Sequence, residues 1–146
     1  MSSGTVRNAL SEGLIRVGEV GIAQGNDAAI NAYFADGYVL HGPNGELDFE
    51  HLKQFFAALR SAFREFKVSR DQIVVEGNML ACRTIMSGIF EHDFTQSPVG
   101  TVRHNGTRVS FELINIFRYN EDGRLIEEWV QMDNRGFLKQ LGVNIA

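Results

Sequence analysis

The first part of the chain carries apolar residues at the spacing of helices. Residues 5–24 repeat apolar positions every three or four residues, and the stripe consists of Val6, Leu10, Leu14, Val17 and Gly21. Asn26 or Asp27 then begins a second short helix over residues 28–34, because either side chain can accept a free backbone N–H. We therefore predict a bent pair of helices at the start of the fold.

The clearest helical pattern follows a short predicted strand at residues 37–41 and a Gly-Pro-Asn-Gly turn, and Asp48 is its predicted N-cap. Its apolar positions are again spaced by three or four residues and comprise Phe49, Leu52, Phe56, Leu59, Phe63 and Phe66. Such a face is too large for a small partner to cover, so we predict that a curved sheet packs against it.

The second half of the chain changes to the pattern of strands. Residues 69–76 and 79–94 are predicted strands, and the Gly77-Asn78 turn joins them into a hairpin. Residues 96–106 contain Pro and Gly and predict a loop of about ten residues, long enough to border a site. A further strand occupies residues 107–120. Helices first and strands later indicate an antiparallel α+β fold.

The last hairpin brings together a group of polar residues. Asp122-Gly123 predicts a type I′ turn, so the strand after it pairs with the strand before it. Because side chains alternate along a strand, one face carries Leu125, Glu127, Trp129, Gln131 and Asp133, unless a bulge intervenes. An acid beside an indole and an amide indicates a site. A short apolar helix follows and ends at Gly142.

Composition narrows the class of protein and its partners. A length of 146 residues fits one domain, and no linker or repeat divides residues 1–146. Eleven Phe among 44% hydrophobic residues predict an aromatic core or cavity lining. A net charge of −4 provides no basic patch, so neither nucleic acid nor an anionic membrane surface is a predicted partner. No segment approaches the roughly 18 apolar residues of a membrane span.

Cysteine and histidine usage sets further expectations. Cys82 is the only cysteine, so no intrachain disulfide can form, and the N-terminus lacks a secretory pattern. We therefore predict a cytoplasmic protein. The four histidines lack metal-ligand spacing, and no glycine-rich phosphate motif occurs, so we predict no metal and no cofactor.

Several short motifs in a fixed order give the chain a resemblance to a known family. They are Phe34-Ala35-Asp36, His41-Gly42-Pro43, Glu76-Gly77-Asn78, Ala81-Cys82-Arg83, residues 122–129, Asp133 and Gln140-Leu141-Gly142. Over residues 28–142 the chain resembles the SnoaL-like polyketide cyclases of the NTF2-like superfamily. The resemblance implies an NTF2-like (cystatin-like) α+β cone, in which a strongly bent, mostly antiparallel sheet wraps around N-terminal helices and encloses a deep pocket.

The resemblance also implies a catalytic role for Asp133, four residues after Trp129. Family cyclases are expected to use an aspartate at this position as general acid and base in an intramolecular aldol closure. Burial in an apolar pocket suits this work, because it raises the pKa of a carboxyl from about 3.9 toward neutrality. The alternative is that Asp133 ends a strand and caps the following helix.

Other residues are candidates for the same pocket. His41 is a candidate catalytic helper at a strand end, although a histidine bonded to backbone at a rim is equally expected there. Asn115 interrupts an apolar strand, so its amide is predicted to face inward toward a ligand or a buried partner. The remaining predicted substrate-binding residues are Trp129, Gln131, Phe63 and Phe90.

Two classes of function stay open. The first is an enzyme of the cyclase, isomerase or hydrolase type that acts on a small apolar carbonyl or polycyclic molecule, which Asp133 and Trp129 favour. The second is a non-catalytic small-molecule-binding module, which Phe90 favours because the family often has a histidine at this position. In either class we predict a homodimer through the apolar sheet face that carries Ile114, Ile116, Ile126, Val130 and Met132.

Overall fold

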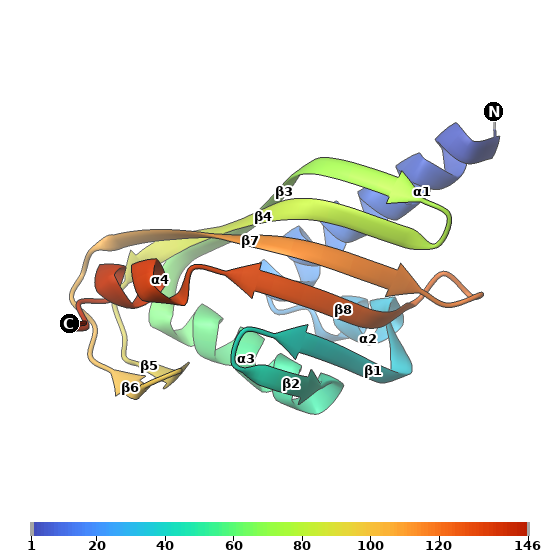
Figure 1. Cartoon of the computed structure of the whole chain (residues 1–146). Helices are drawn as coiled ribbons and strands as arrows, with labels where there is room; N and C mark the ends of the chain where they lie inside the picture. Colours follow the sequence, from blue (N-terminus) through green and yellow to red (C-terminus); the bar gives the residue numbers. More distant parts are fainter. Residues whose placement is uncertain (1, 146) are drawn as a thin grey trace.

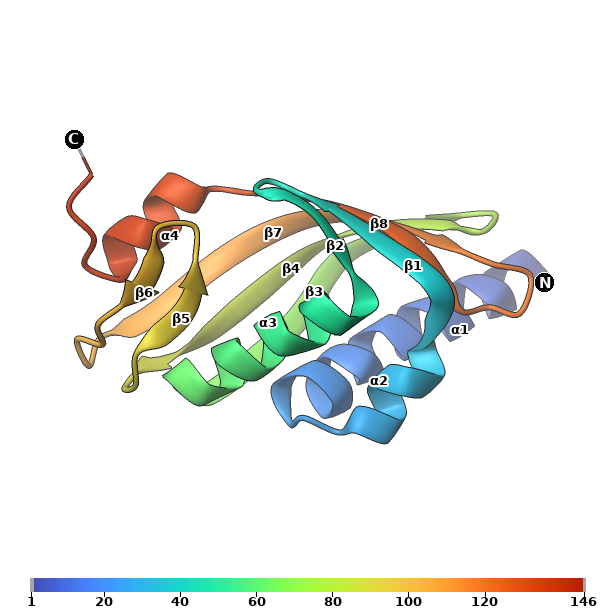
Figure 2. The same cartoon turned by 90° about the horizontal axis from the view of Figure 1, so that it is seen from below.

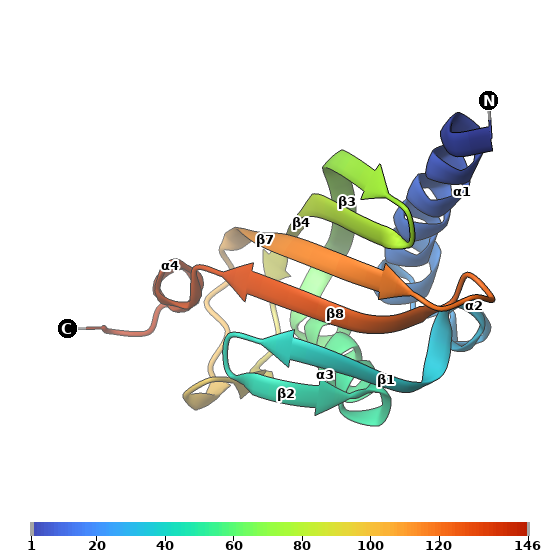
Figure 3. The ribbon, with the colours of Figure 1, turned by 45° about the vertical axis from the view of Figure 1, so that its right-hand side comes forward.

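Within residues 2–145, which the computed structural model describes with side chains from residue 9, six strands form a single bent sheet. They are β1 (Phe34–Gly42), β2 (Gly45–Asp48), β3 (Phe63–Glu76), β4 (Met79–Phe90), β7 (Arg108–Tyr119) and β8 (Leu125–Met132). The strands lie in the order β2-β1-β8-β7-β4-β3 (Figure 3). Neighbouring strands are antiparallel except for β1 and β8, which are parallel.

The helices of the first half cover one face of this sheet. They are α1 (Ser2–Arg16), which continues as the wider π-helical segment η1 (Val17–Ala23), then α2 (Asp27–Tyr33) and α3 (Phe49–Ala62). The sheet arches over α1 and α3, so this face is concave and the opposite face is the outer one (Figures 1 and 2). The predicted α+β arrangement, a bent and mostly antiparallel sheet on N-terminal helices, is confirmed. No described helix has the length and apolar character needed to cross a bilayer.

The far end of the sheet is closed by three short elements. Helix α4 (Asn134–Gln140) and the hairpin of β5 (Phe94–Ser97) and β6 (Gly100–Val102) lie away from the N-terminus (Figure 2). The strand predicted for residues 79–94 therefore ends earlier, and the predicted loop at 96–106 contains most of a hairpin.

The helices begin and pack as their sequences indicate. Asn26 caps α2 by accepting the Ala29 N–H at 3.1 Å, and Asp48 caps α3 by accepting the His51 N–H at 2.9 Å. Leu14 of the N-terminal stripe is fully buried. Val6 of that stripe lies outside the residues whose side chains are described.

Two bulges in β3 help to bend the sheet. Glu65 and Gln72 have positive φ angles of 55° and 51°, although neither is glycine. The pairing of β3 with β4 shifts register at both places, between Arg64 and Lys67 and between Asp71 and Val74. An extra residue on one strand increases the local twist, so β3 can curl around α1 and η1.

The helix predicted to reach Phe66 in fact ends at Ala62, and Phe63 and Phe66 belong to β3. The bulge at Glu65 places both rings on the same side of the strand, with 6.4 Å between their centroids. Residues 63 and 66 therefore keep a helix-like spacing in a strand, which explains the error. The Phe63 ring stacks on Phe90 at 5.2 Å, and both side chains are buried in the core.

The hairpin of β7 and β8 confirms the predicted pairing, but its turn differs from type I′. Of the two central residues expected to have positive φ, only Gly123 does, at 77°. Asn120 shapes the turn instead, because its Oδ1 accepts the N–H groups of Asp122 and Arg124, each at 3.0 Å.

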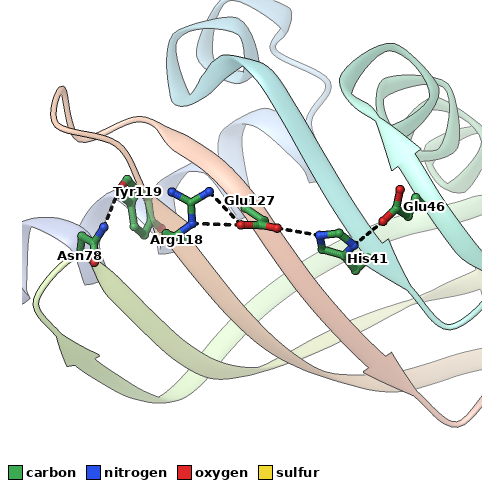
Figure 4. A network of polar contacts seen from close by, with 6 residues as sticks. All are labelled: His41, Glu46, Asn78, Arg118, Tyr119 and Glu127. Carbon is green, nitrogen blue, oxygen red and sulfur yellow. Dashed lines mark hydrogen bonds and ion pairs between the residues drawn. The ribbon is translucent and has the colours of Figure 1, made fainter.

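The outer face of the sheet carries a charged network of side chains from β1, β2, β7 and β8 (Figure 4). His41 Nε2 lies 2.7 Å from Glu127 Oε2, and its Nδ1 lies 2.7 Å from Glu46 Oε2. Glu127 Oε1 also accepts from Arg118 Nη2 at 2.8 Å. The hydrogen bond with Glu127 raises the pKa of His41, because it favours the charged imidazolium.

The apolar part of the outer face is formed by Ile114, Ile116 and Trp129, which are 57%, 43% and 37% exposed. Val130 was predicted on this face but is buried, and both it and Met132 line the concave side. That part of the predicted outer surface is wrong, because β8 turns its other set of side chains outward.

We predict that Phe63→Ala lowers the free energy of unfolding by about 3–5 kcal/mol, because a buried aromatic ring leaves a cavity in contact with Phe90. Urea denaturation monitored by circular dichroism measures the change. Phe66→Ala is the control, since this ring is only partly buried and should cost less than half as much. Equal losses for the two variants would contradict the placement of Phe63 in the core.

A second prediction concerns pH and the outer network. The pKa of His41 is raised in the folded protein, so its ion pairs add stability that is complete below its ordinary pKa and lost as pH rises through the raised value. The difference in unfolding free energy between wild type and His41→Gln should therefore be larger at about pH 6 than at about pH 9. His92→Gln, at a histidine with no described ion pair, should show no such trend. A pH-independent His41→Gln effect would argue against the network.

Candidate functional site

A cavity of about 250 Å³ lies between the concave face of the sheet and the helices. Its walls are mainly apolar and include Leu14, Ile22, Phe56, Met86, Phe111 and Phe137. The β1–β2 turn at Pro43 and the β5–β6 turn at Pro98 also line it, so the predicted loop does border the site. The charged groups in the lining are Arg70 and Glu128, and Asn115 lies between them in the sheet.

Five side chains from five strands form a hydrogen-bonded line across the concave face, which we call the polar row. It runs from Arg70 on β3 through Thr84, Asn115 and Glu128 to Tyr38 on β1. Arg70 Nη1 lies 2.7 Å from Thr84 Oγ1, which lies 2.7 Å from Asn115 Oδ1. Asn115 Nδ2 is 3.0 Å from Glu128 Oε2, and the Tyr38 hydroxyl is 2.6 Å from Glu128 Oε1.

Strand pairing explains why these residues meet. Arg70 pairs directly with Thr84, and Cys82, two residues away on the same face of β4, pairs with Asn115. Glu128 faces inward because it pairs with Phe117 of β7, and a bulge precedes it: Tyr119 pairs with Leu125 and Arg118 with Glu127, which leaves Ile126 as an extra residue. Leu125 and Glu128 both line the cavity as a result.

The chemistry of Arg70 fixes the direction of the hydrogen bonds along the row. A guanidinium can only donate, so the Thr84 hydroxyl must send its own proton onward to Asn115 Oδ1. The amide of Asn115 therefore turns its NH₂ group toward Glu128. Both oxygens of Glu128 receive a hydrogen bond, one from Asn115 and one from Tyr38.

The surroundings of Glu128 change its acid–base behaviour. Burial raises the pKa of this carboxyl above its usual range, although the Tyr38 hydrogen bond and the charge of Arg70 oppose the change. Burial and the neighbouring Glu128 also raise the pKa of Tyr38, so the phenol remains a donor. A carboxyl of raised pKa in an apolar cavity can both take and give a proton near neutral pH.

Asp133, the predicted acid–base residue, lies elsewhere. It is exposed, caps α4 by accepting the Gly136 N–H at 2.9 Å, and does not line the cavity. The alternative prediction, that Asp133 caps the following helix, therefore describes its place in the structure. Trp129 and Gln131 are exposed on the outer face, and His41 stacks on Trp129 there at 5.4 Å. The prediction that these residues share a pocket with Asp133 is wrong, because the cavity receives the opposite face of β8.

The other predicted residues divide between cavity and core. Asn115 faces inward and lines the cavity, as predicted. Phe63 and Phe90 were predicted to bind substrate, but they pack in the core and do not line this cavity.

Glu128 was missed by the sequence reasoning, although one signal pointed to it. Asn115 pairs with Val130, so an inward Asn115 implies an inward Val130 and, two residues earlier, an inward Glu128. That step needed the register between β7 and β8. Among the described residues, no group of three or more His, Cys, Asp or Glu is placed to hold a metal ion, and the absence of a cofactor remains a prediction.

Solved structures share this fold. AclR from Streptomyces galilaeus, named as a candidate hydroxylase, has a TM-score of 0.75 at 20% identity, covering 94% of this chain and 96% of its own. IdmH from Streptomyces antibioticus, named as a candidate polyketide cyclase, has a TM-score of 0.73 at 22% identity, covering 92% and 99%. A Catenulispora acidiphila protein with a ketosteroid isomerase-like fold has a TM-score of 0.68 at 12% identity, and the match covers 91% of this chain and 94% of that protein.

These likenesses confirm the predicted NTF2-like fold. No curated protein sequence matches the chain. The family model for SnoaL-like polyketide cyclases, in contrast, matches residues 19–141, which is most of the chain. The chain therefore belongs to the SnoaL-like polyketide cyclase family.

Proposed function

We propose that the protein is an acid–base enzyme that acts on a small apolar carbonyl compound, with Glu128 as the group that moves the proton. The observation that carries this proposal is the buried carboxyl of Glu128, which is 7% exposed and lines an apolar cavity. Family membership supports carbonyl chemistry, such as an aldol cyclisation or a double-bond isomerisation. Asp133 is not part of the proposed machinery, because it lies at an exposed helix cap.

The proposed step is a proton transfer at carbon. The carboxylate of Glu128 removes a proton from the carbon next to the substrate carbonyl, the electron pair of that C–H bond forms an enolate, and the neutral acid later returns the proton. The raised pKa of Glu128 makes its neutral acid form easier to reach than that of an ordinary carboxyl, which suits a group that returns the proton. Asn115 and Tyr38 hold the carboxyl in one orientation during both steps.

The size of the cavity limits the substrate. A volume of about 250 Å³ lies below the range of roughly 300–1,000 Å³ that is usual for drug-sized ligands. The apolar walls favour a hydrocarbon body with few polar groups. We therefore expect a substrate of roughly one or two rings rather than a large polycyclic molecule.

A non-catalytic binding module is the second candidate, and one observation favours it. Both oxygens of Glu128 already have a protein partner, so the carboxyl is satisfied without a substrate. Phe90, which replaces the histidine often found in the family, is buried in the core. In this case the polar row would serve only to shape and orient a ligand pocket.

Two isosteric substitutions separate these functions. We predict that Glu128→Gln lowers turnover by about 10²–10⁴-fold, because it keeps the shape of the side chain but cannot carry the proton. Asp133→Asn should leave turnover and stability within about 1 kcal/mol of wild type, because Asn is nearly as good a helix cap as Asp. The assay is turnover of a panel of small cyclic ketones, enones and β-keto esters, together with thermal unfolding of each variant.

The outcomes differ clearly between the candidates. Loss of turnover in Asp133→Asn with full activity in Glu128→Gln would return the catalytic role to Asp133. A wild-type protein that binds members of the panel but converts none of them would favour the binding module.

We also propose that the outer face forms a homodimer interface. Ile114, Ile116 and Trp129 are exposed beside one another on β7 and β8, where Ile116 pairs with Trp129. A second copy of the chain would remove this apolar surface from water.

Light scattering should give twice the chain mass of 16.3 kDa at micromolar concentration. Ile116→Lys should reduce this to the single-chain mass, because each copy would place a charge in the interface. A wild-type protein with the mass of one chain would disprove the interface.

A further inference from the structure

Arg70 is a cation in the cavity that has no described carboxylate partner. Its one described hydrogen bond runs from Nη1 to Thr84 Oγ1 at 2.7 Å, and its buried Nε has no hydrogen-bond partner among the described residues. The arginine on the outer side of the same hairpin is different, since Arg83 contacts Asp71 at 2.7 Å and Glu112 at 3.0 Å. Arg70 is partly buried and its guanidinium lies 5.6 Å from the centre of the Phe117 ring, so its charge meets an aromatic face but no carboxylate among the described residues.

The Nε side of the Arg70 guanidinium is buried and packs against η1. Gly18 of η1 lies beside this side, and a Cβ at that position would be 3.3 Å from Nε and 3.7 Å from Nη2. Arg70 lines the cavity although its Nε is buried, so its terminal nitrogens are the donors that a ligand carboxylate can meet. The helix widens to a π-helix at this place, a feature often found at functional sites.

The opposite end of the polar row explains why Arg70 has no internal anion. Glu128 is the buried acid of the cavity, but Thr84 and Asn115 lie between it and Arg70 in the row. The two charges therefore share a cavity without forming an ion pair. The charge of Arg70 nevertheless lowers the pKa of Glu128, so the two groups act on each other.

We propose that Arg70 binds the carboxylate of the ligand, and that the cavity is selective for small apolar carboxylates. The apolar body of such a ligand contacts the aromatic walls, and its charged end reaches the terminal nitrogens of Arg70. This inference rests on the proposed function only in using the same cavity. It adds that the carbonyl substrate carries an acid group, held at the Arg70 end of the row.

The test compares two probes that share one carbon skeleton, the anion trans-cinnamate and the neutral amide trans-cinnamamide, by isothermal titration calorimetry. Wild type should bind cinnamate about 10- to 100-fold more tightly, as expected for charge-assisted hydrogen bonds. Arg70→Met should abolish this preference and retain cinnamamide binding. Thermal unfolding of Arg70→Met checks that the fold is kept, because Thr84 loses one donor in this variant.

Two further variants control for net charge and for access to the guanidinium. Arg83→Met removes the same charge from the outer side of the sheet and should keep the preference for cinnamate. Gly18→Ala keeps every charge but adds a methyl group that presses on the Arg70 guanidinium from the side of η1, so it should weaken cinnamate binding more than cinnamamide binding.

Equal affinities of wild type for the two probes, no measurable binding of cinnamate at millimolar concentration, or an unchanged preference in Arg70→Met would each overturn the proposal. These results are independent of catalysis. A cinnamate preference that depends on Arg70, found together with full turnover in Glu128→Gln, would keep the anion site and reject the acid–base role. Loss of turnover in Glu128→Gln, found together with equal binding of the two probes, would keep the acid–base role and reject the anion site.

Discussion

A guanidinium group can donate hydrogen bonds but cannot accept them, and this constraint orders the interior of the protein. Because Arg70 donates to Thr84, the direction of each following hydrogen bond in the polar row is fixed. The amide of Asn115 is thereby oriented, and the carboxyl of Glu128 is presented with donors on both oxygens. A buried network of this kind stabilises one arrangement when all its members are satisfied, and is costly when any of them is not.

The same strand gives neighbouring acids opposite properties. Glu128 faces the cavity, where burial raises its pKa. Glu127 faces outward, where hydrogen bonds from His41 and Arg118 lower its pKa. Burial thus favours the neutral form of Glu128, whereas the hydrogen bonds favour the charged form of Glu127, which holds the outer network together. Strand alternation, rather than any difference in residue type, separates a chemical role from a structural one.

Local pattern was sufficient for most of the fold. The helix caps at Asn26 and Asp48, the two long hairpins and the inward amide of Asn115 all follow from residues close together in sequence. The site was harder, because Glu128 meets Tyr38 across 90 positions of sequence and the strand register that joins them is not visible locally. The bulges at Glu65 and Ile126 were missed for a related reason: each inserts a residue that carries no composition signal.

The bulge at Ile126 also makes the cavity sensitive to the length of the chain. It allows Leu125 and Glu128, three positions apart, to face the same side of the sheet. Loss of a single codon here would force a choice, since either Leu125 would leave the core or Glu128 would leave the cavity and Trp129 would enter it. Members of this family could thus exchange an acidic interior for an aromatic one through an insertion or deletion that leaves their overall composition nearly unchanged.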